Sequence, residues 1–200
     1  MTIKLYTIFS ILLLVFGAVI MSLEILASNL MSPYFGGSVY TWGSIISSFM
    51  VHLSIGYVLG GHYSKRTSSI LPLIILLITA SVWIILIPQI HPSVCEFISE
   101  KITDVRLGSL SATNIIFFIP ITIMAMVSPY VIGLISEYDN KSSFTAGIVL
   151  SISTLGSFVG TNITAFYLID MFPISRIVTG LGLICLVLSV GISLLRISRK

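Results

Sequence analysis

Glu24 is the single acid within the long apolar run that begins the sequence. An ionised carboxylate inside a membrane span costs several kcal/mol unless it meets a partner, water or a proton. On a helical wheel Glu24 aligns with Gly17, Ile20, Ser28 and Met31, which predicts a face turned toward other helices. Two interpretations follow. Glu24 is either a cation or proton site reached from a water-filled cavity in the outer half of the bilayer, or a protonated carboxyl hydrogen-bonded to a neighbouring helix.

His52 is the second candidate, because it lies near the middle of the next apolar run. Ser44, Ser48 and Gly56 recur on its face at steps of one helical turn, so this stripe is expected to face protein or water rather than lipid. The histidine is either a structural side chain with satisfied hydrogen bonds or a proton relay. A direct ion pair with Glu24 is a further alternative, although Glu24 is closer in depth to Ser48.

Soluble catalytic machinery is missing from the sequence. No strand followed by a glycine-rich turn and a helix is present, so neither a dinucleotide-binding nor a methyltransferase-like fold is expected. The three histidines fit no metal motif, and no nucleophile is paired with a base. Cys95 in a polar segment and Cys185 in an apolar run are not expected to form a disulfide. We therefore expect no enzyme activity, no catalytic residues, no metal and no cofactor.

The composition is that of a membrane protein, with 56% hydrophobic residues, 8% charged residues and a mean hydropathy of +1.11. The net charge of +3 comes from scattered cations at the ends of apolar runs, which argues against nucleic acid as a partner. About 20 helical residues cross a bilayer core. That length predicts an all-α six-helix bundle as a single domain over residues 1–200, with a first run too long to be a cleaved signal. The outer loop at 91–109 is either a solvated cap or a short amphipathic surface helix with Val94, Ile98 and Ile102 on one side. The predicted spans are 6–30, 39–61, 70–90, 110–136, 144–169 and 174–195.

The basic residues predict the orientation of the bundle. Seven lie on the side that carries both termini and three on the other, which favours cytoplasmic termini in the cell (plasma) membrane. The seven are Lys4, Lys65, Arg66, Lys141, Arg196, Arg199 and Lys200, and the three are Lys101, Arg106 and Arg176.

Two short matches suggest an internal repeat. The tripeptide SPY ends the first run at 32–34 and recurs in the fourth at 128–130. Glycine pairs one turn apart occur in the second run, at Gly56 and Gly60, and in the fifth, at Gly156 and Gly160. The copies would be a 3+3 inverted repeat, resembling half of a major facilitator fold, or else chance similarity between apolar segments. The glycine pairs predict close helix packing, either within the bundle or between two copies.

Five runs carry a family resemblance. They read EILASNLMSPYFG at 24–36, YTWGSII at 40–46, LSIGYVLGG at 53–61, MVSPY at 126–130 and SISTLGSFVGT at 151–161, the last continuing to YLI at 167–169. In this order the runs resemble the membrane module of the fused transporter and spermidine synthase proteins. That resemblance implies a bundle similar to part of the major facilitator superfamily, with Glu24 as the matching acidic position.

The resemblance does not extend to the polyamine aminopropyltransferase domain of that family, whose catalytic residues have no counterpart here. The segment HYSKR at 62–66 also lacks the family's aspartate, and His52 stands where a small or aliphatic residue is expected.

Three functional hypotheses remain open at this point. The first is a carrier-like protein for polyamines or other small cations, with Glu24, Ser28, Ser48 and His52 as the intramembrane polar site and a homodimer or partner subunit completing the path. The second is a membrane anchor for a separate cytoplasmic synthase. The third is a subunit of a larger membrane complex. Pro120 and Pro129 are expected to kink the fourth span.

Overall fold

Helices account for nearly all of the residues that the computed structural model describes, which are 3–66, 69–136 and 142–194. No strand occurs among them. The elements are α1 (Ile3–Phe35), α2 (Val39–Arg66), α3 (Leu71–Lys101), α4 (Val105–Ala125), α5 (Val127–Ser136), α6 (Ser142–Ile163), the π-helix η1 (Thr164–Leu168), α7 (Ile169–Met171) and α8 (Ile174–Leu194). Six spans in the described residues are long and apolar enough to cross a bilayer. The predicted six-helix all-α bundle is confirmed, and the chain is a multi-pass membrane protein.

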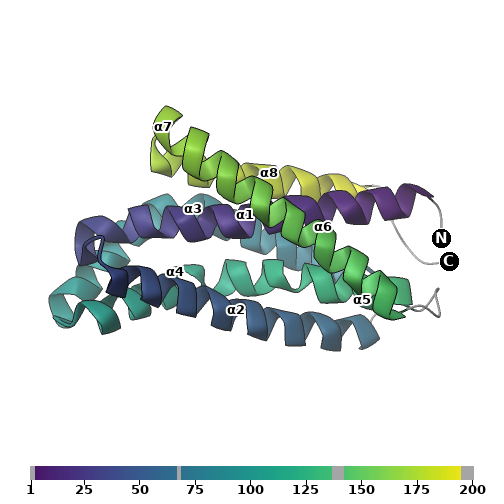
Figure 1. The fold of residues 1–200 in the computed structure, drawn as a ribbon, viewed down its shortest axis with the longest axis horizontal. Coiled ribbons are helices and arrows are strands. Elements are labelled where there is room, and N and C mark those ends of the chain that lie inside the picture. Colours follow the sequence, from purple (N-terminus) through teal and green to yellow (C-terminus); the bar gives the residue numbers. More distant parts are fainter. Residues whose placement is uncertain (1–2, 67–68, 137–141, 195–200) are drawn as a thin grey trace.

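Both termini lie at one end of the bundle, here called the terminal end, and the other is called the opposite end (Figure 1). The links at the opposite end are short, at 36–38, 102–104 and 172–173. Gly36 has a φ of 76° and donates its N–H to the carbonyl of Ser32, so a left-handed glycine ends α1. The predicted last residue of the sixth span, Leu195, lies outside the described residues. So do four of the cations that predict the orientation: Lys141, Arg196, Arg199 and Lys200.

The segment predicted as an outer loop, 91–109, is largely helical. Helix α3 continues to Lys101, α4 begins at Val105, and only 102–104 connects them. The mixed charges of this segment suggested a loop, but Cys95 and Ile98 are buried, so this part of α3 is an amphipathic continuation that packs on the bundle. Cys95 therefore lies in a helix rather than in a polar loop. Both cysteines are free, as predicted.

The fourth span is broken between α4 and α5. Proline cannot donate an N–H, and its ring collides with the carbonyl of the residue one turn before it. For Pro129 that residue is Ala125, where α4 ends. The backbone N–H of Met126 donates to the carbonyls of Ile123 and Met124, not to the carbonyl one full α-helical turn earlier. The kink expected from Pro129 is thus present in the structure.

Pro120 stays inside α4 without ending it. Its missing N–H frees the carbonyl of Ile116, and the indole N–H of Trp83 on α3 donates to that oxygen at 2.9 Å. An unpaired carbonyl in hydrocarbon is costly, so this bond satisfies the group that the proline leaves without a partner. It also fixes the register of α3 against α4.

We expect the Trp83→Phe variant to lose about 1 kcal/mol of unfolding free energy from the hydrogen bond, in addition to a packing loss. In a Pro120→Ala background the new N–H of residue 120 binds Ile116, so the same change is expected to cost less. Unfolding in sodium dodecyl sulfate, measured for the four proteins of this cycle, tests the coupling. Equal costs of Trp83→Phe in both backgrounds would contradict the assignment.

The most extensive helix contacts join α1 to α6, α2 to α4 and α3 to α8. Glycines permit the first two. A Cβ at Gly156 would overlap the backbone of Leu14, and one at Gly160 the backbone of Ala18. On the other pair, Gly56 meets Thr122 and Gly60 meets Met126. Close packing within the bundle, the first of the two predicted roles of these four glycines, is therefore observed.

The pairing of helices has the form that an inverted repeat requires. Exchanging the first three spans with the last three converts the pair α2 and α4 into the pair α6 and α1, and leaves α3 and α8 together. The glycine pairs do not follow this exchange, however. The α2–α4 crossing lies in the half of the bundle nearer the terminal end and the α1–α6 crossing lies near the middle, whereas an axis in the membrane plane would place the two at equal distances on opposite sides of the middle. The inverted repeat remains a prediction, and the glycine match does not support it.

We expect Gly156→Ala to destabilise the bundle by about 1–3 kcal/mol, because the added methyl group meets the fixed backbone of α1. Gly147 on the same helix is the matched control, since a Cβ there meets nothing within 4 Å. Gly147→Ala should be neutral or slightly stabilising through helix propensity. The measurement is the free energy of unfolding in mixed micelles, and a neutral Gly156→Ala would refute the proposed tightness of the α1–α6 crossing.

Candidate functional site

Glu24 projects from the half of α1 nearer the opposite end, and its side chain is half-buried. It forms no hydrogen bond or ion pair with another described residue. Only two polar side-chain atoms among the described residues are both fully enclosed and unpartnered, and neither belongs to Glu24. Its carboxylate oxygens therefore reach the surface of the bundle and are not sealed among aliphatic groups.

The face of α1 that carries Glu24 is flanked by α2 and α6, with the break between α4 and α5 beneath it. Ile20 and Gly17, one and two turns before Glu24, line a small cavity of about 10 Å³ together with Tyr57 of α2, Ser128 of α5 and Ser153 of α6. Beyond this point α6 crosses over α1 toward α7, while α2 runs along the other side of the bundle (Figure 1). Helices α2 and α6 therefore diverge from the level of Tyr57 and Ser153 toward the opposite end.

Ser28, one turn beyond Glu24 on the same face, is also half-buried. Its hydroxyl donates to the carbonyl of Ile25 at 2.8 Å, within its own helix. Such a bond satisfies the hydroxyl locally and leaves its lone pairs available to water or a ligand. Glu24 and Ser28 therefore share one face, as predicted.

Ser48 and His52 belong to a separate polar group on the seam between α2 and α4. The Nε2 of His52 lies 2.8 Å from the Oδ1 of Asn114, and the Nδ2 of Asn114 donates to the Oγ of Ser48 at 3.1 Å and to the carbonyl of Leu110 at 2.7 Å. Because the amide nitrogen of Asn114 is occupied by acceptors, its oxygen faces the histidine. The Nε2 of His52 must therefore carry a proton and donate.

The surroundings of His52 are apolar apart from Asn114. The side chain is fully buried, and its ring lies against Phe49 and edge-on to Phe118. Its Nδ1 has no partner, and neither does the Oγ1 of Thr122, one turn after Phe118 on α4. These two are the only enclosed, unpartnered side-chain atoms among the described residues. The geometry supports a structural histidine that joins two helices, and His52 forms no ion pair with Glu24 in this structure.

The structure therefore divides the four predicted site residues into two pairs. Glu24 and Ser28 lie on an open face of α1, whereas Ser48 and His52 lie in the closed α2–α4 seam. The direct partner of His52 was not predicted, although Asn114 is a polar residue in an apolar run. A single sequence does not give the register of the second span against the fourth, so the pair was not identifiable from it.

The π-helix η1 was also not foreseen. At its first residue, the Oγ1 of Thr164 donates to the Oγ of Ser22 on α1 at 2.8 Å, and Ser22 donates to the carbonyl of Gly160 at 3.2 Å. Single π-turns often occur near functional sites because they shift the register of the residues that follow. Here the widened turn lies beside α1 near the depth of Glu24.

No protein-family model matches the chain, and no characterised protein or solved structure is similar to it at the significance required.

We expect His52→Phe and Asn114→Leu each to cost about 1–3 kcal/mol of stability, because each leaves a partner unpaired inside the membrane. The double variant removes both polar groups, so its cost should fall clearly below the sum of the two. Unfolding free energies in detergent provide the measurement, with Ser47→Ala on the exposed side of α2 as a near-neutral control. Additive costs would show that the two side chains act independently.

Proposed function

We propose that this chain is one half of a carrier-like assembly for polyamines or other small organic cations, in which Glu24 binds the cation or a coupling proton. The observation that carries the proposal is an accessible acid within a span, flanked by the two least apolar of the six spans. An accessible carboxylate at that depth is tolerable only where water, a proton or a cation reaches it.

The polarity of the helices that flank Glu24 supports this proposal. Helices α2 and α6 are the least apolar of the six spans, with mean hydropathies of 1.4 and 1.5, against 2.3 to 2.6 for the others. Yet α6 is also the least buried span, with 22% of its apolar window enclosed. A helix that faces lipid over most of its surface is expected to be among the most apolar. The exposed surfaces of α2 and α6 are nevertheless mixed, because large apolar side chains such as Met50, Val58 and Phe158 stand beside small and hydroxylated ones.

Small and hydroxylated residues interrupt the apolar surface of both helices. Gly43, Ser47 and Ser54 on α2 and Ser151 and Thr154 on α6 are all exposed. Small and hydroxylated side chains favour close helix association within membranes. In the proposed assembly, a second copy covers the outer parts of α2 and α6 around a twofold axis. The Glu24 faces of the two copies then enclose a shared polar path.

The proposed substrate class follows from the charge and the aromatic group near the path. Glu24 is the one acid far from the ends of the described spans, and no described cation neutralises it. Tyr57, 46% exposed, lines the same cavity as Gly17 and Ile20 on the Glu24 face of α1. An acid that no cation neutralises is suited to an ammonium group, and Tyr57 offers an aromatic ring one turn or more along the same face of α1. Polyamines are proposed within that class because of the sequence resemblance described above.

We expect proteoliposomes containing the natural protein to take up labelled spermidine, and Glu24→Gln to reduce the rate by at least about tenfold, since a neutral amide neither pairs with an ammonium nor exchanges a proton. The matched control is Glu96→Gln, because Glu96 is exposed near the end of α3. Uptake over time, with and without a proton gradient, is the measurement.

Equal uptake by the natural and Glu24→Gln proteins would remove Glu24 from the mechanism. No uptake by the natural protein, together with a soluble aminopropyltransferase that copurifies with it, would favour the anchor hypothesis instead. Native mass spectrometry of the same proteoliposome preparations should detect a dimer. A purely monomeric protein that still transports spermidine would contradict the proposal that a second copy completes the carrier.

A further inference from the structure

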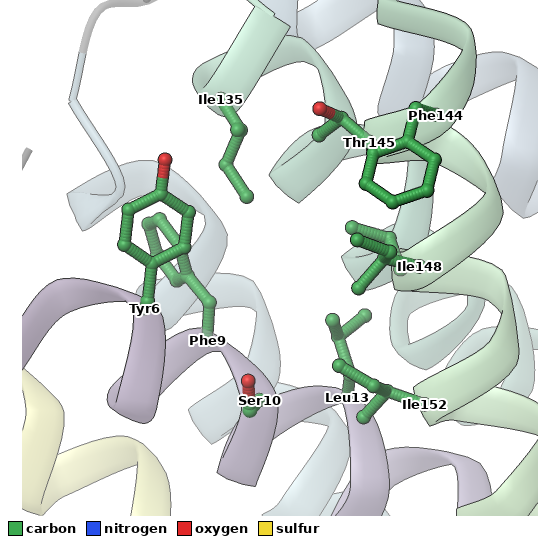
Figure 2. Close-up of a pocket in the computed structure, with 10 residues that line it drawn as sticks. Tyr6, Phe9, Ser10, Leu13, Ile135, Phe144, Thr145, Ile148 and Ile152 are labelled. Carbon is green, nitrogen blue, oxygen red and sulfur yellow. The ribbon is translucent and has the colours of Figure 1, made fainter. Parts of the chain in front are cut away.

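A pocket at the terminal end of the bundle lies away from the Glu24 face and has no role in the proposed transport. It has a volume of about 240 Å³ and lies between α1, α5 and α6 (Figure 2). Its lining residues are Tyr6, Phe9, Ser10, Leu13, Ile135, Phe144, Thr145, Ile148, Val149 and Ile152.

The pocket is a consequence of how the helices cross. Helices α1 and α6 approach to backbone contact at Leu14 with Gly156 and at Gly17 with Ser153. Straight helices that touch at one point separate on either side of it. Toward the terminal end the resulting wedge is not filled by either helix, and Ile135 of α5 forms a third wall. The break at Met126 gives α5 its separate course from α4.

The lining is mostly apolar, with two hydroxyls toward its outer end and the hydroxyl of Ser10 beside Leu13 at the inner end. Figure 2 shows Leu13 and Ile152 at one end of the open space, with the oxygens of Tyr6 and Thr145 near the other end beside Ile135. Phe9 and Ile148 face each other across the gap. Apart from these two hydroxyls, Ser10 supplies the only other polar side chain in the lining.

The position of the pocket along the spans determines whether lipid or water surrounds it. Tyr6 is the first residue of the first span, and Thr145 follows the start of the fifth span at Ser143. The hydroxyl end therefore lies at the depth of the lipid head groups, and the apolar end roughly 10 Å deeper, because each residue of a helix rises 1.5 Å. Water does not fill an apolar cavity, and an empty one loses dispersion contacts. A lipid chain can fill it from the side.

We propose that this pocket binds one hydrocarbon chain of a membrane lipid, with the polar end of that lipid near the hydroxyls of Tyr6 and Thr145. The volume suits a single chain and is smaller than the cavities that hold drug-sized molecules. The shared chemistry is a long alkyl chain with a hydrogen-bonding end, as in a phospholipid tail or a free fatty acid. This inference is independent of the proposed transport function.

The test uses the full-length protein in nanodiscs that contain a trace of phosphatidylcholine with a photoreactive diazirine in one chain. Mass spectrometry of the labelled peptides should find the adduct concentrated within residues 6–13 and 144–152. The Ile148→Trp change fills the pocket and should lower this labelling at least fivefold. The control is Val187→Trp, because Val187 is 71% exposed on α8 and lies outside the pocket, so labelling of the pocket should be unchanged.

Further arms separate the alternatives. Should Ile148→Trp fail to fold, Ile148→Phe provides a milder filling of the same space. Thr145→Val should weaken labelling about threefold if its hydroxyl holds the polar end. A photoreactive fatty acid that labels the same peptides and is displaced by the phospholipid identifies the phospholipid as the preferred source. Labelling spread evenly over all lipid-facing helices, labelling unaffected by either pocket-filling change, or a protein–protein cross-link at Ile148 in place of a lipid adduct would overturn the proposal.

Discussion

The fold depends on close contact between the backbones of helices that carry no hydrophobic driving force toward one another. Lipid tails are as apolar as leucine, so helices in a bilayer associate through dispersion contacts and hydrogen bonds. Gly156 and Gly160 let α6 rest on the backbone of α1, and Gly56 and Gly60 do the same for α2 and α4. Every site described above takes its geometry from these two crossings. They place the Glu24 face between two diverging helices and create the wedge that holds the proposed lipid.

Hydrogen bonds between spans add to the close helix packing. They occur where a backbone or side-chain polar group would otherwise have no partner. Trp83 binds the carbonyl that Pro120 releases, Asn114 joins His52 to Ser48, and Thr164 reaches Ser22 across a widened turn. Each bond connects two spans and thereby fixes their register. Glu24 differs from these groups, because it forms no hydrogen bond or ion pair with another described residue.

Much of the architecture could be predicted from the sequence because the bilayer imposes a length and a polarity on each span. The six spans follow from the length of the apolar runs. The kink before Pro129 and the shared face of Glu24 and Ser28 follow from residue positions within a single helix. The segment 91–109 was predicted as a solvated loop with an amphipathic helix as the alternative, and the buried Ile98 and Cys95 in a continuous α3 agree with the helical alternative. The pairing of His52 with Asn114 and the π-turn at Thr164 depend on contacts between segments far apart in the chain. Such contacts cannot be inferred from a single sequence.

The three largest helix contacts all connect the first half of the chain to the second: α1 with α6, α2 with α4 and α3 with α8. The two sets of three helices are therefore interlocked, and neither contains enough internal contact to stay together alone. Sliding one set past the other would break all three seams at once. The six helices consequently pack as one bundle, and in the proposed carrier assembly an exchange of openings between the two sides of the bilayer would come from rocking of this bundle against a second copy.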